Sequence, residues 1–250
     1  MTYFFVVFLA YQTPLNIPRG SHTAAVFART TADGRPVEAF TISWLPTRLG
    51  TDPREAIFLL QRPEPGRNYS VAETLEQGSV RSRQLRRWGP FQIRPEVYTR
   101  ALERHHQLNS GRIQYTVLDH AARGAVNCIH ALAGAVDAVP LVTGFKRGFA
   151  ATRAVLGHFL GDDPQRRFVR YPVVHEWLSG PLGVAGVPHA AALPYRGSTV
   201  ALSELESRGV VRRELAAGAL FAPEVGVRLL PPEALTPAGW APALPGPVSR

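Results

Sequence analysis

The stretch Val126-Asn-Cys-Ile-His-Ala-Leu-Ala-Gly-Ala-Val136 combines a helix signal with the only cysteine of the chain. Its apolar residues recur with helical spacing, so the sequence predicts a helix from Cys128 to about Val136 that buries one stripe. That stripe consists of Ile129, Leu132, Ala133 and Val136. Asn127 stands where an N-cap belongs, because its side-chain oxygen can accept a backbone N–H of the first turn. We therefore expect Cys128 in the first turn of a buried helix.

The first turn of a helix favours the reactive form of a cysteine. A thiol attacks a carbonyl only as the thiolate. The unpaired N–H groups and the dipole at the helix start stabilise negative charge there, and the same N–H groups can hold an oxyanion. The helix supplies no base, so a histidine from elsewhere in the chain must take the thiol proton.

His22 is the best candidate for that base. It lies at the start of a strand predicted over residues 21–30, SHTAAVFART, and a strand holds an imidazole rigidly. Small or medium side chains share its face, which leaves room for a helix to pack there: Ala24, Val26 and Ala28.

Two further strands flank that one. Residues 3–11 form an apolar run of strand length, and residues 37–45, VEAFTISWL, follow the turn signal Asp33-Gly34. The chain is therefore expected to open with an antiparallel meander of three strands.

Four segments together carry a resemblance to a known superfamily. They are SHTAAVFAR (21–29), TISWLP (41–46), WGPF (88–91) and VNCIHAL (126–132). A histidine strand that precedes a cysteine helix resembles the circularly permuted papain-like families. These are the permuted NlpC/P60-type proteins, which include the lecithin:retinol acyltransferase-like enzymes. More narrowly, the set is similar to a bacterial family of hypothetical proteins. The resemblance covers residues 3–160 and extends at most to residue 193.

The resemblance implies Cys128 as nucleophile and His22 as base, with a third polar group that orients the imidazole. In the permuted families this group comes from the strand after the histidine strand. With the turn centred at residues 33–34, Leu45 falls opposite His22, and Ser43 and then Thr41 are the nearest polar residues on that face. Neither is the His, Asn or Gln expected there. This departure supports a second hypothesis, a binding module that keeps the fold without the chemistry.

Each candidate also has a structural interpretation. Cys128 could be a buried core cysteine that behaves as a small hydrophobe, and His22 could simply bond a backbone carbonyl. Trp44 and Trp88 could line a substrate cleft, or they could pack in the core. For Cys128 we favour the nucleophile, because of its placement after an N-cap.

The formal net charge of +9 raises the question of a nucleic-acid partner. All but Lys146 of the 28 basic residues are arginine, and they are spread along the chain except for one cluster. The cluster, Arg81, Arg83, Arg86 and Arg87, could bind an anionic substrate, although charges that guard a strand edge are commoner. We expect a solvated basic face, and we rank a nucleic-acid binder third.

Metal and cofactor sites are not indicated. His105 and His106 could be combined with His120 and His130, but adjacent histidines on a helix point apart, and no second cysteine or HExxH spacing supports zinc. No GxGxxG or Walker loop is present, so we expect no nucleotide cofactor.

The remaining segments complete the expected order of elements. Ser70-Val-Ala-Glu73 is a capping box that opens a helix to Gly78, and Pro95 begins another. The other expected elements are a rigid turn at 88–91, a helix over 149–160, one helical turn at 175–178 and a helix pair over 201–220.

The sequence thus predicts an α+β protein in which a small antiparallel sheet or half-barrel packs against the Cys128 helix. Residues 1–193 would form this domain, and residues 194–250 a partly disordered extension. The expected chemistry is hydrolysis or transfer of an amide, ester or thioester taken from a small-molecule, peptide or lipid substrate. One cysteine cannot form an internal disulfide, and residues 1–10 lack a basic leader pattern, so we expect a cytoplasmic protein without a transmembrane segment.

Overall fold

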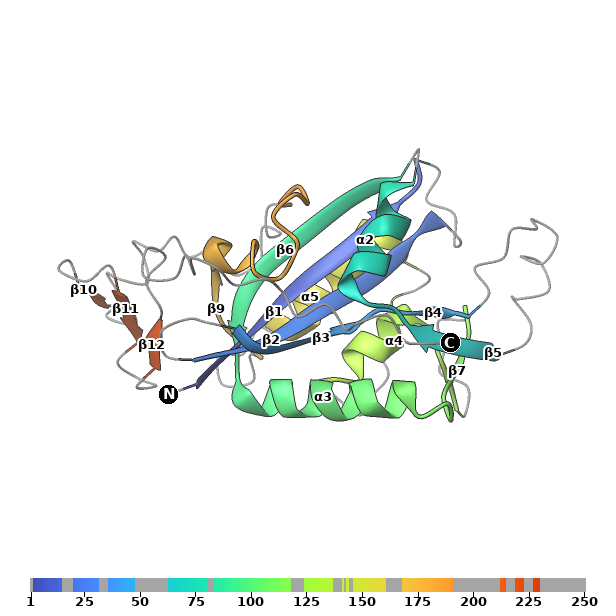
Figure 1. The fold of residues 1–250 in the computed structure, drawn as a ribbon, viewed down its shortest axis with the longest axis horizontal. Coiled ribbons are helices and arrows are strands. Elements are labelled where there is room, and N and C mark those ends of the chain that lie inside the picture. The colour runs from blue at the N-terminus through green and yellow to red at the C-terminus, as the bar shows by residue number, and fades with distance from the viewer. Residues whose placement is uncertain are drawn as a thin grey trace.

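A computed structural model describes most of the first 190 residues and three short strands beyond them (Figure 1). The described residues are 2–14, 20–31, 36–47, 63–80, 83–117, 124–136, 141, 143, 146–160, 168–190, 212–214, 219–222 and 227–229. In chain order the elements are β1 Thr2–Gln12, β2 His22–Thr31, β3 Pro36–Ile42, β4 Trp44–Pro46, β5 Glu64–Asn68, α2 Val71–Ser79, β6 Gln84–Ile93, α3 Pro95–Asn109, β7 Gln114–Tyr115, β8 Ala125–Val126, α4 Cys128–Ala133, α5 Gly148–Leu160, β9 Val169–Val174, η2 Glu176–Leu178, β10 Arg212–Glu214, β11 Ala219–Ala222 and β12 Val227–Leu229.

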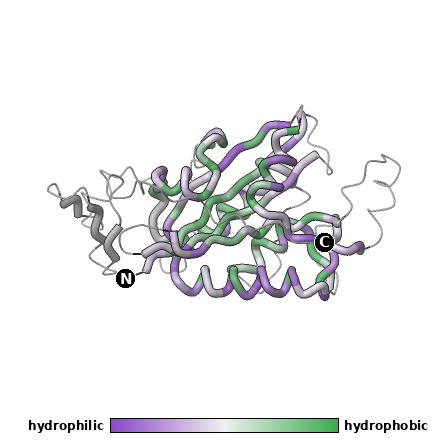
Figure 2. The backbone as a smooth tube through the Cα atoms, in the orientation of Figure 1, coloured by the Kyte–Doolittle hydropathy of each residue, from purple (hydrophilic) through white to green (hydrophobic). Residues whose placement is uncertain are grey.

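The protein is α+β, as expected, and is built on an antiparallel sheet with the order β3-β2-β1-β6-β9. β1 is central, and its alternate residues enter two apolar clusters. Phe8 faces the cluster that α3, α4 and α5 complete, while Phe5 faces the cluster that α2 and residues 178–187 complete. Burial on both faces explains why β1 is apolar almost throughout. Figure 2 shows this as green along the central strands, whereas α3 alternates between purple and green.

The predicted meander β1-β2-β3 is confirmed, and its register is the predicted one from Ala25 to Arg29, with a shift between Arg29 and Thr30. Ala25 pairs with Ile42 and Arg29 with Glu38, which is the register that a turn centred at residues 33–34 requires. The third strand is shorter than expected, because β3 ends at Ile42 and β4 joins a second sheet of order β4-β5-β7-β8. The chain therefore changes sheet at Ser43, one residue before β4.

The side chain of Asn68 accounts for that change of sheet. Its Oδ1 accepts the Ser43 N–H at 2.7 Å, and its Nδ2 donates to the Thr41 carbonyl at 2.6 Å. A neighbouring strand would normally bond these two backbone groups. A side-chain amide carries one donor and one acceptor and can replace the strand locally, so β3 can end without leaving them unpaired.

The expected turn at residues 88–91 is wrong, because β6 runs through it. Gly89 adopts φ 87°, and the register with β1 shifts between Val6 and Phe8, which is a β-bulge. A Cβ on Gly89 would lie 2.9 Å from the Val6 carbonyl oxygen, so only glycine fits this close approach. Gly-Pro is a turn signal in isolation, but a bulge admits both residues inside a strand.

The interpretation of the arginine cluster as an exposed edge is also wrong for Arg87, which is 3% exposed. β6 lies inside the sheet, between β1 and β9. The Arg87 guanidinium donates to the carbonyls of Val187 and Gly89, both at 2.9 Å, and pairs with Glu176. Arg87 therefore anchors residues 176–187 to the sheet. Arg81 lies outside the described residues.

The helix predictions mostly hold. The Ser70–Glu73 capping box opens α2, Pro95 begins α3, α5 lies where a helix was expected, and a single helical turn forms at η2. α4 begins at Cys128 as expected but ends at Ala133, with turns to Val136. Among the described residues, no helix has both the length and the apolar character needed to cross a membrane.

The expected helix pair over 201–220 is wrong where the structure describes it, because β10 and β11 are strands there. With β12 they form a three-stranded antiparallel sheet. The rest of the predicted extension over 194–250 lies outside the described residues.

Candidate functional site

Cys128 is the first residue of α4, where the sequence placed it. Asn127 is the N-cap, and its Oδ1 accepts the N–H of His130 at 2.8 Å. The Cys128 side chain is partly exposed and packs against the apolar cluster that α3, α4 and α5 complete. The thiol therefore lies at the edge of the core, in the first turn of α4.

The backbone N–H groups of Thr23, Ile129 and Cys128 itself face the sulfur. Thr23 belongs to β2, and the pairing of β2 with β3 ends at the pair Ala25–Ile42. Thr23 therefore has no partner residue in β3. The sulfur thus faces an N–H of β2 just past the end of the neighbouring strand. Burial raises the pKa of the Cys128 thiol to about 11, against the lowering effect of these three N–H groups. The free protein therefore holds a neutral thiol at pH 7.

His22 precedes Thr23 and is 1% exposed. Its Nε2 lies 2.9 Å from Ser43 Oγ, while its buried Nδ1 has no hydrogen-bond partner among the described residues. Burial, and next the positive charge of Arg83, lower the pKa of His22 to about 3. The imidazole is therefore neutral at pH 7.

Ser43 makes two hydrogen bonds in addition to the one with His22. Its Oγ accepts from Thr74 Oγ1 at 2.7 Å, and its N–H donates to Asn68. The change of sheet at Ser43 turns this side chain toward α2 and His22 together. Ser43 thus holds the position that the sequence assigned to an orienting residue.

Thr41 does not reach His22. It pairs with Val26, four residues further along β2, and its carbonyl bonds the side chains of Asn68 and His105. A strand rises about 3.3 Å per residue, so the two side chains are more than one hydrogen-bond length apart. Of the two orienting candidates, the structure brings only Ser43 to the imidazole.

The two tryptophans expected in a cleft lie in the core. Trp44 and Trp88 are each 1% exposed and belong to the cluster that α3, α4 and α5 cover. Trp88 packs edge-on against Phe149, with ring centroids 5.9 Å apart, and Trp44 lies against Gly66. Packing explains both side chains.

Sequence reasoning missed three polar contributors, Thr74, Asn68 and Tyr11. Tyr11 pairs with His22 across β1 and β2, with ring centroids 5.4 Å apart. Burial raises the pKa values of Tyr11 and Tyr115, and negative charge at Cys128 raises both further. The capping box located the helix that carries Thr74, but nothing local indicated that it would meet Ser43.

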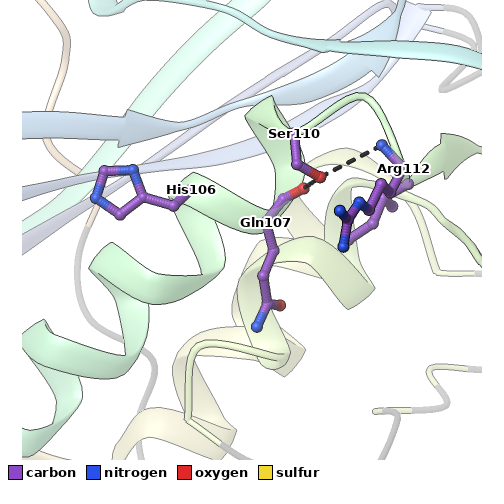
Figure 3. Close-up of a pocket in the computed structure, with 5 residues that line it drawn as sticks. His106, Gln107, Ser110 and Arg112 are labelled. Atoms are coloured by element: carbon purple, nitrogen blue, oxygen red, sulfur yellow. Dashed lines mark hydrogen bonds between the residues drawn. The ribbon is translucent and has the colours of Figure 1, made fainter.

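An open hollow of about 400 Å³ lies at the end of α3 (Figure 3). It is lined by His106, Gln107, Ser110, Arg112 and Ile113. Ser110 Oγ donates to the Gln107 carbonyl at 2.7 Å and accepts the Arg112 N–H at 3.3 Å, so these polar groups serve to close the helix. None of the residues at Cys128 lines it. Within the described part of the chain, no three His, Cys, Asp or Glu side chains gather as metal ligands.

Comparisons with protein-family models, with curated proteins and with solved structures each find no match.

Proposed function

We propose that the protein is a thiol hydrolase or acyltransferase of the permuted papain-like kind, with Cys128 as nucleophile and His22 as base. One observation carries the proposal. Ser43 engages His22 Nε2, Nδ1 has no partner among the described residues, and the next residue of the strand is Thr23, whose N–H faces the Cys128 sulfur. An imidazole held at one nitrogen and free at the other is what a general base needs.

The reaction requires the tautomer with the proton on Nε2, which donates to Ser43 Oγ and leaves a lone pair on Nδ1. Nδ1 accepts the thiol proton as Sγ attacks the carbonyl carbon of the substrate. The carbonyl π electrons move to oxygen, and N–H groups at the start of α4 stabilise this oxyanion. The oxyanion then collapses, the bond to the leaving group breaks, and Nδ1–H protonates that group. Water or an acceptor alcohol or amine then attacks the thioester on Sγ, which regenerates the thiol.

The substrate in this proposal is an amide, ester or thioester of a small molecule, peptide or lipid. In the free protein both reacting groups are neutral, because burial holds Cys128 at a pKa of about 11 and His22 at about 3. Proton transfer must therefore accompany attack instead of preceding it. Binding of substrate has to stabilise the imidazolium that forms.

A second candidate rests on the same pKa values. A binding module that keeps the fold without turnover would have no need of an ionised thiol, and burial leaves both groups neutral. In that case Ser43 and His22 form a buried structural hydrogen bond, which is a common role for a buried histidine.

The pH dependence of Cys128 alkylation by iodoacetamide separates the two candidates. If His22 is the base, the wild-type protein at pH 7 reacts faster than His22→Ala, because only the wild type can remove the proton during attack. The matched control is His175→Ala, which removes another buried histidine and leaves the rate unchanged. Equal rates in the wild type and His22→Ala, rising only toward the high pKa of the thiol, would support the binding module.

A further inference from the structure

Two arginines stack on tyrosines near the site, and they differ in one respect. Arg67 lies over the Tyr69 ring, with its guanidinium carbon 4.3 Å from the centroid, and pairs with Glu73. Arg83 lies over the Tyr11 ring at 4.8 Å, but no carboxylate pairs with it among the described residues. A carboxylate pairs with the first guanidinium, whereas the described residues supply none to the second.

Arg83 is also incompletely hydrogen-bonded. Its Nη1 donates to the Gln77 carbonyl at 2.5 Å and lies 3.4 Å from Gln77 Oε1. In the described part of the chain its Nε and Nη2 have no hydrogen-bond partner, and the side chain is partly exposed. Those two nitrogens form the planar fork that binds a carboxylate with two parallel hydrogen bonds.

The Arg83 guanidinium is close to the proposed base. Arg83 covers Tyr11, and the Tyr11 ring lies beside the His22 ring. After burial, the charge of Arg83 is the next cause that lowers the pKa of His22, and it also acts on Tyr11, which in turn senses Cys128. A cation so placed disfavours the imidazolium that the proposed reaction needs.

We propose that Arg83 binds a carboxylate carried by the acyl substrate, so that the site prefers anionic acyl compounds to neutral ones. This inference rests on the proposed function. A bound carboxylate would pair with the fork and offset the positive charge beside His22, which makes proton transfer from Cys128 easier. Among the described residues, the polar and charged groups that the contacts place around His22 are Tyr11, Ser43 and Arg83, and none of these supplies negative charge at pH 7. The substrate itself has to bring that charge.

The test uses alkylating probes that share one reactive group. They are the N-iodoacetyl derivatives of glycine, 4-aminobutyrate and 6-aminohexanoate, each compared with its neutral methyl ester. For at least one chain length we expect the acid to alkylate Cys128 about two- to fivefold faster than its ester, the range that one partly exposed ion pair supports. Arg83→Gln should abolish the preference, and Arg67→Gln should keep it.

Acid and ester rates that are equal at every chain length would overturn the inference. So would a preference that survives Arg83→Gln. If Arg83→Gln does not fold, as far-UV circular dichroism would show, Arg83→Lys replaces it. Lysine keeps the charge without the fork and should reduce the preference, and an unchanged preference contradicts bidentate binding. His22→Ala distinguishes the failures, because it tests the proposed function: it should slow acid and ester alike, whereas Arg83→Gln acts on their ratio.

Discussion

Two of the buried histidines, His22 and His175, sit in surroundings that differ instructively. Both are nearly inaccessible, and burial lowers the pKa of each, to about 3 for His22 and about 4 for His175. His175 lies among aromatic rings, edge-on to Phe5 at 5.0 Å and to Trp177 at 6.2 Å, and its buried Nε2 has no partner among the described residues.

His22 instead joins a polar relay. Ser43, Thr74 and Asn68 hold it on one side, and the Cys128 sulfur faces the next residue of its strand. A buried neutral histidine is therefore no sign of function here, since His175 is one as well. What distinguishes His22 is the oriented hydroxyl at Nε2 and its place one residue before Thr23 in β2.

The largest expected effect separates the two histidines by reactivity. Because general-base catalysis contributes about 10² to 10⁴ in rate, His22→Ala should lower thioester or 4-nitrophenyl ester turnover by at least about 10²-fold. His175→Phe should leave turnover within a few-fold, since an aromatic ring fills the same apolar site. Stopped-flow or steady-state hydrolysis measures both, with Cys128→Ala as the blank. Equal losses in the two variants would remove the functional distinction.

Stability toward acid should show what the two histidines share. In the unfolded chain each takes up a proton near pH 6.5, but in the folded protein only near pH 3 or 4, so the unfolded state binds more protons between those values. Stability is therefore full above about pH 6.5 and falls as the pH decreases. Linkage gives about 2 kcal/mol lost per histidine between pH 7 and pH 5.

Urea denaturation at pH 7 and pH 5 measures this loss. His175→Phe should remove about half of the difference between the two pH values, whatever its effect on absolute stability. A pH dependence unchanged in His175→Phe would mean that other groups cause the acid sensitivity.

The parts of the site that sequence reasoning found are those with a local or periodic signal. The N-cap at Asn127 and the helix start at Cys128 are decided within four residues. Ser43 followed from counting along an antiparallel hairpin, whose register from Ala25 to Arg29 is the predicted one, although β3 ends at Ile42 and Leu45 pairs with Arg67 instead of His22.

The parts it missed depend on contacts between distant segments. Asn68 meets Ser43 across 25 residues and Thr74 meets it across 31, and neither position has a pattern of its own. Trp88-Gly-Pro-Phe91 was misjudged for a related reason. Glycine and proline signal a turn locally, and only pairing with β1 shows that they form a bulge inside β6.

A smaller effect concerns the hydroxyl that distinguishes His22. Ser43→Ala removes the partner of Nε2 and leaves a buried nitrogen unsatisfied, so stability should fall by about 1–3 kcal/mol. If Ser43 positions the base, alkylation of Cys128 at pH 7 should slow by about tenfold, because the ring can then rotate. Thr41→Ala is the matched control, since the side chains of Asn68 and His105 bond its backbone carbonyl, which the substitution keeps, and it should leave the alkylation rate unchanged. A stability loss in Ser43→Ala with no change in alkylation would assign Ser43 a structural role alone.

The smallest expected effect tests whether acid sensitivity belongs to the histidines or to the start of α4. Asn127→Ala removes the side-chain cap on the His130 N–H and should cost about 1 kcal/mol. Because Asn127 does not titrate and neither His22 nor His175 changes its surroundings, the loss should be the same at pH 7 and pH 5. Urea midpoints at the two pH values measure it. A loss at pH 7 that vanished at pH 5 would mean that α4 has already detached in acid. The protonation of His22 and His175 would then not be the first step of acid unfolding, and α4 at the Cys128 end of the sheet would unfold before the rest.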